Sequence, residues 1–446
     1  MKLHKTFSGG IHPQELKEAT RQKATIRAKV PPQVTIPLIQ HTGAPCQPLV
    51  KVGDTVKKGQ LIADAEQFIT APIHASISGV VKEIKTTPHP IAGKSLSITI
   101  TSDGRDEWYE SVKPRKDVAG LTKDEITDII RRAGIVGLGG AAFPAHVKLK
   151  PPKKIDTVIL NGAECEPYLT CDDRLMRERA QEVIKGLLLI MRAVDVQRAV
   201  VAIESNKPEA IEVMKKTLKT FKPAEFLDKE LILRVLPVKY PQGSEKQLIE
   251  TVLNRRVPSQ SLPLHVGCVV HNVGTAVAMY QAVYEGKPLI ERSITLSGDC
   301  IKEPLNIAVR IGTAVRQLVD DECGGFVRDV SKIIVGGPMM GIAQPTFDFP
   351  VIKGISGVLF LSERYAPVFD ETACIRCGRC VNVCPMNLLP LVYAKLVKAQ
   401  KWEQLKGYYI ADCMECGSCA YVCPARIPLV QYVKTGKREL LKRQKK

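Results

Sequence analysis

Eight cysteines form two copies of one pattern near the carboxyl end of the sequence. Each copy reads Cys-x2-Cys-x2-Cys-x3-Cys-Pro, and each cysteine recurs 39 positions later. In bacterial ferredoxins, three close thiolates of such a run bind one 4Fe–4S cluster, and the fourth cysteine binds the other cluster. The pattern therefore predicts two 4Fe–4S clusters with crossed ligands. The two sets are Cys374, Cys377, Cys380 and Cys423, and Cys413, Cys416, Cys419 and Cys384.

Zinc is the alternative metal for clustered cysteines. Structural zinc sites take four ligands, commonly from paired Cys-x2-Cys units, and eight cysteines in this arrangement fit zinc poorly. The 28 residues between Cys384 and Cys413 have helical spacing, which favours a helical two-cluster domain over a small ferredoxin. The six other cysteines have no ligand spacing, and we expect small buried packing residues. They are Cys46, Cys165, Cys171, Cys268, Cys300 and Cys323.

A second candidate site is the glycine-rich segment 134–150. Glycines allow backbone N–H groups to approach a phosphate closely, and Lys148 adds a positive charge. The segment lacks the GK[ST] of a P-loop and the order of a Rossmann GxGxxG, so the residues alone leave a purely structural turn open. Segments 161–168, 240–248 and 271–275 each follow a predicted strand, at the rim where α/β sheets bind ligands.

The elements that must position these residues alternate between helix and strand from about 120 to 260. We expect helices at 124–133, 177–194 and 209–220, and strands at 155–160, 199–203 and 231–238. This alternation predicts a parallel α/β sheet. Residues 294–335 follow as β-β-α-β, which predicts a small β-grasp-like module.

The region from 33 to 100 consists of short strands broken by Gly, Pro and Asp. Gly53-Asp54 predicts a hairpin turn there. The arrangement is similar to the sandwich of biotinyl and lipoyl carrier domains, which need a lysine at the tip of a central hairpin. The corresponding tip, residues 64–72, contains no lysine. We therefore expect a scaffold that carries no group.

Together these segments resemble the flavin- and NADH-binding subunit of respiratory complex I and, most closely, the RnfC subunit of the Rnf ion-translocating ferredoxin:NAD oxidoreductase complex. The resemblance runs from the opening Thr-Phe-Ser-Gly-Gly-Ile-His-Pro at 6–13 to the paired cysteine runs. It implies a multidomain α/β protein. The implied domains are an N-terminal region with a barrel-sandwich hybrid at 1–112, a Rossmann-like FMN/NADH domain at 113–262, a β-grasp (SLBB-like) module at 263–350, and a C-terminal helical two-cluster ferredoxin domain with a basic tail at 360–446.

The resemblance also implies which residues hold FMN. The glycine loop and Lys148 would hold the phosphate and the ring edge, and Asn161 would hydrogen-bond the isoalloxazine. The glycines concerned are Gly137, Gly139 and Gly140, and Asn272 with Thr275 would bind the ribityl chain or phosphate. Ala142 departs from the family pattern, because relatives usually carry glycine there.

The nicotinamide side of the pocket is implied in the same way. Phe143 would stack on the nicotinamide or adenine of NAD(H). Glu164 and Glu166 would line the nicotinamide and ribose, and Gly243 with Glu245 would form the opposite wall. No side chain is expected to act as a catalytic acid or base, because the cofactors carry the chemistry.

The function implied is that of the NAD(H)-facing electron-transfer subunit of a membrane-bound complex, which passes electrons between NAD(H), flavin and two 4Fe–4S clusters. Its implied partners are membrane-embedded and peripheral subunits of the Rnf complex, with ferredoxin reached through one of them. The implied location is peripheral, on the cytoplasmic side of the cell membrane. The alternative is a soluble NADH-linked diaphorase subunit without membrane coupling.

Composition agrees with a globular protein of 446 residues, 45% hydrophobic and 25% charged. Neither a secretory signal nor an apolar stretch of the roughly 18 residues needed to span a bilayer is expected. The net charge of +18 allows nucleic acid, lipid or acidic protein as a partner, but no nucleic-acid-reading motif occurs. Two oxidised clusters of roughly −2 each would lower it to about +14.

Overall fold

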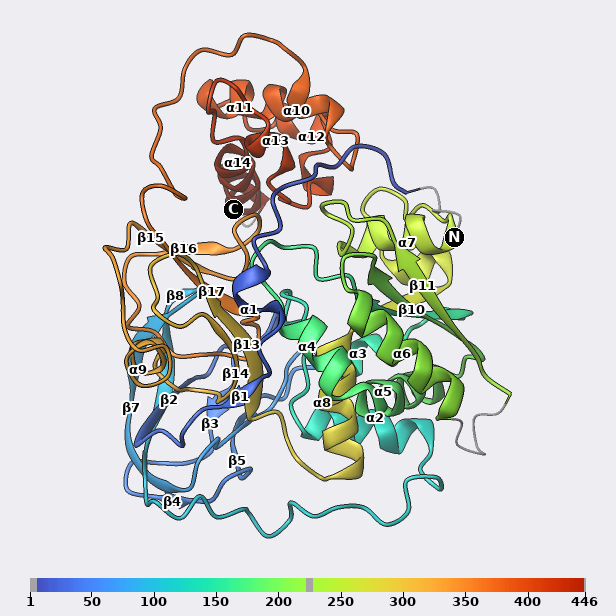
Figure 1. Ribbon diagram of the computed structural model, residues 1–446, viewed down its shortest axis with the longest axis vertical. Coiled ribbons are helices and arrows are strands. Elements are labelled where there is room, and N and C mark those ends of the chain that lie inside the picture. The colour runs from blue at the N-terminus through green and yellow to red at the C-terminus, as the bar shows by residue number, and fades with distance from the viewer. Residues whose placement is uncertain (1–5, 222–227, 445–446) are drawn as a thin grey trace.

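The computed structural model describes residues 6–221 and 228–444. Figure 1 shows two sheet-rich domains on the left, an α/β domain on the right, and a helical domain above both. The N-terminal segment runs between the helical domain and the α/β domain. The sites predicted from the sequence lie in the α/β and helical domains.

The α/β domain contains a parallel sheet of four strands in the order β11-β10-β9-β12, as predicted. Alternate residues of β9 face opposite sides: Val158 and Leu160 pack under α5 and α8, whereas Ile159 packs with Leu248 of α7. Helices therefore cover both faces, and the strand ends form one edge. The elements are α2 (Lys123–Arg132), α3 (Ala145–Lys148), β9 (Thr157–Gly162), α4 (Cys171–Glu178), α5 (Ala180–Ala193), β10 (Arg198–Glu204), α6 (Pro208–Thr220), β11 (Glu230–Leu236), α7 (Glu245–Leu253), η2 (Pro263–Val266), β12 (Cys268–Asn272) and α8 (Val273–Tyr284).

The single helix predicted at 177–194 is two helices, α4 and α5. Arg179 lies between them with φ −130° and ψ 32°, outside the helical region. Its guanidinium bonds Glu182 in the first turn of α5, with an Nε–Oε1 distance of 2.9 Å. Because α4 begins six residues earlier than the predicted helix, Asp172 and Asp173 stand at a helix N-terminus that the sequence pattern did not indicate.

A mixed sheet of six strands contains the predicted β-β-α-β unit. Its order is β1-β14-β13-β17-β15-β16. Strand β1 comes from the N-terminal region and β17 follows residue 350, so two strands outside the predicted 263–350 module complete the sheet. The elements are α1 (Glu18–Arg21), β1 (Ile26–Arg27), β13 (Glu291–Ser297), β14 (Leu305–Arg310), α9 (Val315–Asp321), β15 (Lys332–Val335), β16 (Ile342–Gln344) and β17 (Gly357–Leu361).

The barrel-sandwich domain packs two small antiparallel sheets around a core that includes Ile36, Ile62 and Ile98. Gly53 adopts a left-handed turn with φ +94°, but the following strand β4 pairs with β7 and not with the segment before the turn. The hairpin predicted at Gly53-Asp54 is therefore wrong in its pairing. The strands are β2 (Gln33–Pro37), β3 (Gln47–Pro48), β4 (Thr55–Val56), β5 (Leu61–Asp64), β6 (Ile73–His74), β7 (Gly79–His89) and β8 (Gly93–Ser102).

The β5–β6 tip, where carrier domains have their lysine, contacts other domains instead. The carbonyl of Phe68 lies 3.1 Å from Nε2 of His146 in α3. The carbonyl of Pro72 accepts a 2.7 Å bond from the buried Lys353 ammonium, which also bonds the Gly134 carbonyl. The tip thus joins the barrel-sandwich to its neighbours.

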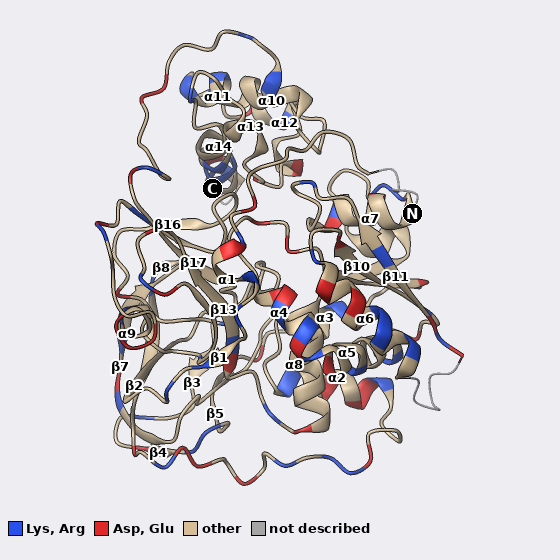
Figure 2. Ribbon diagram, in the orientation of Figure 1, with Lys and Arg blue, Asp and Glu red and all other residues tan. Residues whose placement is uncertain are grey.

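The helical domain packs α11 against α14 around Tyr393, Leu396 and Val433. The segment expected as a basic tail lies largely within α14, where Lys437 bonds the Cys413 carbonyl and Glu415, and Lys445 and Lys446 lie outside the described residues. Figure 2 shows basic residues over all the domains. Among the described residues, no helix has the length and apolarity to cross a bilayer. The helices are α10 (Arg379–Asn382), α11 (Pro390–Lys398), α12 (Gln404–Gly407), η3 (Ile410–Asp412), α13 (Ser418–Tyr421) and α14 (Leu429–Gln444).

The crossing of α5 and α8 gives a test of the α/β core. A Cβ on Gly186 of α5 would lie 1.9 Å from the carbonyl oxygen of Ala276 in α8. We predict that Gly186→Ala destabilises the domain by about 1–3 kcal/mol through overpacking, measured as a lower midpoint of thermal unfolding. Gly407→Ala in α12 is the control, because a Cβ there meets no atom within 4 Å. Equal midpoints for the two variants would contradict this close crossing.

Candidate functional site

The sequence motifs meet at the carboxyl ends of the parallel strands. Asn161 is the penultimate residue of β9 and lies in register beside Asn272, the last residue of β12. The Asn161 amide donates a 2.8 Å bond to the carbonyl of Gly243. Thr275 accepts a 2.9 Å bond from the backbone N–H of Leu138 in the glycine loop. Four segments far apart in sequence therefore line one rim, as expected for a ligand site of an α/β sheet.

The glycine loop is a tight turn closed by its own backbone. Gly137 N–H donates to the Phe143 carbonyl at 2.8 Å, and Ala142 N–H donates to the Gly137 carbonyl at 3.1 Å. Within residues 6–221 and 228–444, the exposed N–H groups of Gly139 and Gly140 bond no acceptor. Exposed amides in such a turn fit an anionic group such as the FMN phosphate. Ala142 has φ +48°, a left-handed conformation that glycine adopts at less cost than alanine.

Lys148 and Glu245 form an ion pair across the rim. The ammonium of Lys148 lies 2.6 Å from Glu245 Oε1 and also bonds the Val270 carbonyl at 2.9 Å. The resemblance places Lys148 at the FMN phosphate and Glu245 in a wall of the nicotinamide pocket, and the structure joins the two side chains directly. Phe143 is half-buried at the end of the glycine loop.

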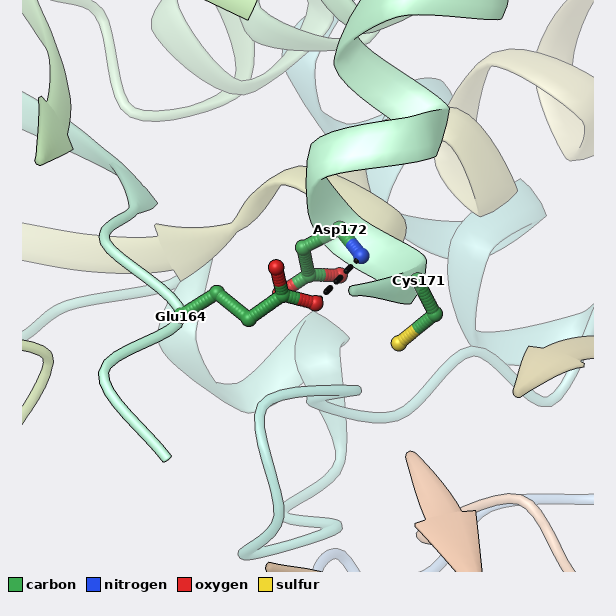
Figure 3. Close-up of side chains that lie close together, drawn as sticks. All are labelled: Glu164, Cys171 and Asp172. Carbon is green, nitrogen blue, oxygen red and sulfur yellow. Dashed lines mark hydrogen bonds between the residues drawn. The ribbon is translucent and has the colours of Figure 1, made fainter. Parts of the chain in front are cut away.

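Glu164 points into the protein and has a side chain that is only 4% exposed. Its carboxylate accepts a 2.7 Å bond from the backbone N–H of Asp172, at the start of α4 (Figure 3). It also accepts a 3.3 Å bond from the backbone N–H of Asp173. Negative charge at a helix N-terminus is stabilised by the free N–H groups and the helix dipole. The observed contacts of this carboxylate therefore hold α4, in contrast to the role expected in lining the nicotinamide pocket.

Asn272 links α4 to the glycine loop. Its side-chain oxygen caps α8 by accepting from Gly274 N–H at 2.8 Å, and its amide donates to Asp172 Oδ2 at 2.6 Å. A Cβ added to Gly139 would lie 3.3 Å from the Asn272 Cβ. Asn272 and Thr275 thus use their observed side-chain bonds to shape the rim itself.

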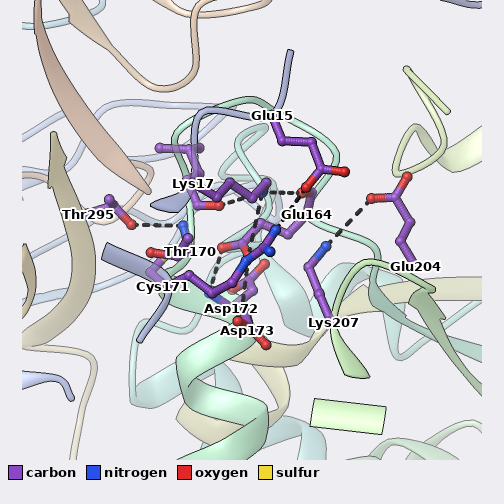
Figure 4. Close-up of polar contacts among 12 residues, drawn as sticks. Glu15, Lys17, Glu164, Thr170, Cys171, Asp172, Asp173, Glu204, Lys207 and Thr295 are labelled. Carbon is purple, nitrogen blue, oxygen red and sulfur yellow. Dashed lines mark hydrogen bonds and ion pairs between the residues drawn. The ribbon is translucent and has the colours of Figure 1, made fainter. Parts of the chain in front are cut away.

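A buried network of charges surrounds Glu164 (Figure 4). Lys17 donates to the carbonyls of Glu164 and Leu169 at 2.8 and 2.5 Å, and Lys207 lies 3.5 Å from Glu204. No motif in the sequence predicts this network. The adjacent acidic residues Asp172 and Asp173 could indicate it, but only if a helix is predicted to begin at that point.

Two carboxyl groups of this network have altered acidities. Burial, together with the nearby charge of Glu164, raises the pKa of Asp172 to about 7 and the pKa of Asp173 to about 6. The side chain of Asn272 lies between Asp172, which it bonds, and Gly139 of the glycine loop. A group that changes charge near neutral pH therefore lies beside the candidate flavin site.

Glu166, by contrast, reaches out of the α/β domain. Its carboxylate accepts the N–H groups of Met339 at 3.0 Å and Met340 at 2.9 Å, in the loop after β15. The Tyr240 hydroxyl lies 3.3 Å from the same carboxylate and donates a 2.7 Å bond to the carbonyl of Cys416. Burial raises the pKa of Glu166. The candidate nicotinamide wall is thus in contact with a cysteine loop of the helical domain.

The eight motif cysteines line two separate cavities. The cysteines of one cavity are Cys384, Cys413, Cys416 and Cys419. We call them the proximal set, because the carbonyl of Cys416 bonds Tyr240 of the α/β domain. The other cavity lies farther out and exposes two of its thiols, and we call its cysteines the distal set: Cys374, Cys377, Cys380 and Cys423.

The repeat is also visible in the backbone. Arg376 and Glu415 occupy the same position of the two motifs and have φ +56° and +60°, and glycines with positive φ follow at 378 and 417. These left-handed residues curl each loop around its cavity, and four thiols around one space fit a 4Fe–4S cluster. Of the other six cysteines, five are buried, and Cys165 accepts a 3.3 Å bond from Gly243 N–H.

Comparisons with known proteins agree with this arrangement. Four family models match in order: the RnfC barrel sandwich hybrid domain at residues 5–105, the Nuo51 FMN-binding domain at 130–281, the SLBB domain at 293–343 and the 4Fe-4S dicluster domain at 373–427.

Two curated relatives match most of the chain. One belongs to the proton-translocating ferredoxin:NAD(+) oxidoreductase complex of Clostridium ljungdahlii and is 49% identical, over 91% of this chain and 87% of its own. The other belongs to the Na(+)-translocating complex of Acetobacterium woodii and is 44% identical over 99% of both chains. The chain belongs to the RnfC family. In both organisms the relative is one subunit of an ion-translocating ferredoxin:NAD(+) oxidoreductase.

A solved structure extends the comparison of the fold. The NAD+-reducing [NiFe]-hydrogenase in the air-oxidised state has a chain with a TM-score of 0.51 and 19% identity, matching 72% of this chain and 61% of its own. This RnfC chain thus shares its architecture with a chain of that hydrogenase.

The raised pKa of Asp172 predicts a pH-dependent stability. The folded chain holds a proton on this carboxyl at pH values where the unfolded chain, with a pKa near 3.8, has released it. The contribution of this carboxyl to stability therefore falls as pH rises from about 4 to about 7. In Asp172→Asn this contribution is absent, so its free energy of unfolding in urea should change less over this range than that of the wild type. Asp128→Asn, on the exposed face of α2, is the control, and an unchanged slope in Asp172→Asn would contradict the assignment.

Proposed function

We propose that the chain is the NAD(H)-facing electron-transfer subunit of an ion-translocating ferredoxin:NAD(+) oxidoreductase complex. One observation carries this proposal. The hydroxyl of Tyr240, next to the rim where we place the flavin, donates a hydrogen bond to the carbonyl of Cys416 in the proximal set. The family model for FMN binding covers the rim, and the dicluster model covers both cysteine sets. In this proposal, electrons would pass between a nicotinamide site at the rim, the proximal set and the distal set.

FMN and two 4Fe–4S clusters are the cofactors, and NAD(H) is the substrate. Bound FMN supplies the exchange between two-electron nicotinamide chemistry and the one-electron chemistry of the clusters. In the proposed site, the amides of Gly139 and Gly140 hold the phosphate, with Gly137 closing the turn. Lys148 and Asn161 reach the same rim, while Asn272 and Thr275 keep the loop in place.

The nicotinamide would lie between Phe143 and the wall made by Glu166, Gly243 and Glu245. Glu164 supports this wall from behind, through the start of α4. The ligands of one cluster would be the proximal set and those of the other the distal set, each with three cysteines of one run and the Cys-Pro cysteine of the other. The four-domain division stays part of the proposal, with β1 and β17 added to the β-grasp module.

The distal set faces outward, and we infer that partner subunits would dock beside it. Cys374 and Cys377 are exposed, and between them lie Ile375, which is 68% exposed, and Arg376. Subunits of the membrane complex, including the one that receives electrons from ferredoxin, would dock there, with this chain peripheral on the cytoplasmic side. The relatives named as complex subunits favour this proposal over a free diaphorase.

Substitutions in the pocket test the nicotinamide site. We expect Glu166→Ala and Phe143→Ala to lose most NADH-dependent dye reduction and to retain their iron, because both residues lie on the rim and neither is a cluster ligand. Glu212→Ala, on the exposed surface of α6, is the control and should match the wild type. Full activity in both pocket variants would overturn the pocket assignment.

Double substitutions test the crossed ligand sets. Cys384→Ser with Cys413→Ser removes two ligands of one proposed cluster, so iron should fall from about eight to about four atoms per chain. Cys384→Ser with Cys374→Ser removes one ligand from each, so nearly all iron should be lost. If each run instead held its own cluster, the two results would be exchanged.

A further inference from the structure

The opening segment of the chain lies against the α/β domain beside Tyr240. Ile11 and Tyr240 exchange two backbone bonds, with Ile11 N–H donating at 2.9 Å and Tyr240 N–H donating at 2.8 Å. Lys239 donates a 2.7 Å bond to the Phe7 carbonyl, and Phe7 is 1% exposed. Residues 7–11 are therefore fixed to the segment that leads into the flavin rim.

The same segment contacts the helical domain on its other side. Gly10 N–H donates a 2.8 Å bond to the carbonyl of Val383. A Cβ on Gly9 would lie 2.8 Å from the carbonyl oxygen of Cys384, a member of the proximal set. In Figure 1 this segment passes between the α/β and helical domains. It touches one cysteine of the proximal set while Tyr240 bonds another, Cys416.

The contact is made by backbone against backbone. Gly9 and Gly10 have φ +71° and +81°, and a Cβ on Gly10 would lie 2.7 Å from the Tyr240 carbonyl oxygen. Glycine is the residue that adopts this conformation without strain. The two glycines let the segment lie closely between the domains.

The chain segment that connects the helical domain to the rest of the protein has no regular structure of its own. Residues 362–373, which join it to β17, have no helix or strand and are mostly exposed. A link of this kind leaves the position of the helical domain to its noncovalent contacts. The contacts of residues 7–11 and Tyr240 with the cysteine loops are central among them, since Ile11, Tyr240 and Cys416 share one apolar cluster.

We propose that residues 7–11 form a clamp that, together with Tyr240, positions the proximal cluster against the flavin site. Gly9, Gly10 and Tyr240 are positioning residues, and the clamp sets the rate at which electrons pass between flavin and the proximal cluster. This inference rests on the proposed function. One NADH gives up a hydride, which is two electrons and one proton. With FMN and both clusters bound, one electron would go to each cluster and the proton would pass to water.

The test compares Gly9→Ala with Gly93→Ala in the full chain loaded with FMN and iron. Gly93 has φ +76°, close to that of Gly9, but a Cβ there meets no atom within 4 Å, so backbone strain is matched and only the contact differs. In Gly9→Ala we expect unchanged iron and flavin content and an unchanged rate of flavin bleaching by NADH. Cluster reduction by NADH should be slower by about tenfold, because small misplacements of reacting centres have large kinetic effects.

Two measurements independent of turnover accompany the rates. Amide hydrogen exchange in 7–12 and 238–242 should be faster in Gly9→Ala than in Gly93→Ala, because the backbone bonds of the clamp are weakened. Direct reduction with dithionite should reduce both clusters in all variants. Tyr240→Phe removes only the hydroxyl bonded to Cys416, and it should alter the electron paramagnetic resonance spectrum of one cluster and leave that of the other unchanged.

Equal rates of cluster reduction in Gly9→Ala and Gly93→Ala would overturn the clamp. If Gly9→Ala does not load with iron, the clamp is tested with Tyr240→Phe alone. Wild-type spectra and a wild-type rate of cluster reduction in Tyr240→Phe would then overturn the clamp. A different result concerns the proposed function. If the loaded wild type shows no flavin bleaching or no cluster reduction by NADH, the proposed function fails, whatever the exchange data show for the clamp.

Discussion

The bond between the Tyr240 hydroxyl and the Cys416 carbonyl is the contact on which the proposed electron path depends. A hydroxyl carries one proton, and the 2.7 Å distance assigns it to Cys416, with the Glu166 carboxylate 3.3 Å away. Glu166 in turn holds the loop of Met339 and Met340. The α/β domain, the β-grasp module and the helical domain therefore meet at the Glu166 carboxylate and the Tyr240 hydroxyl. A displacement there would move the proximal set relative to the flavin rim.

Behind this junction, buried charges hold the rim in shape. Lys17, Glu164, Lys207 and Glu204 are almost fully enclosed, and buried ions are tolerated when they are paired and hydrogen-bonded. The start of α4 supplies N–H donors to Glu164, and Asp172 carries the connection on to Asn272. Removing one partner of such a network is costly, because an uncompensated charge would remain. The network gives the glycine loop a rigid support.

Much of this architecture could be predicted from the sequence, because its signals are local. The parallel sheet follows from the alternating helix and strand patterns. The cysteine spacing predicts two groups of four, and the same two groups line the two cavities. Contacts between distant segments carry no such signal. The pairing of β1 with β14 and the ion pair of Lys148 with Glu245 depend on tertiary packing. Asp172 was missed because α4 starts before the periodic pattern that predicted a helix.

The central claim is that electrons pass between NAD(H) and two clusters through a flavin held at this rim. The most direct measurement is an anaerobic NADH titration of the full chain, reconstituted with iron, sulfide and FMN and followed in the visible spectrum. The account predicts that NADH bleaches both the flavin and the iron–sulfur absorbance. A fully loaded protein whose spectrum does not change on addition of NADH would contradict it.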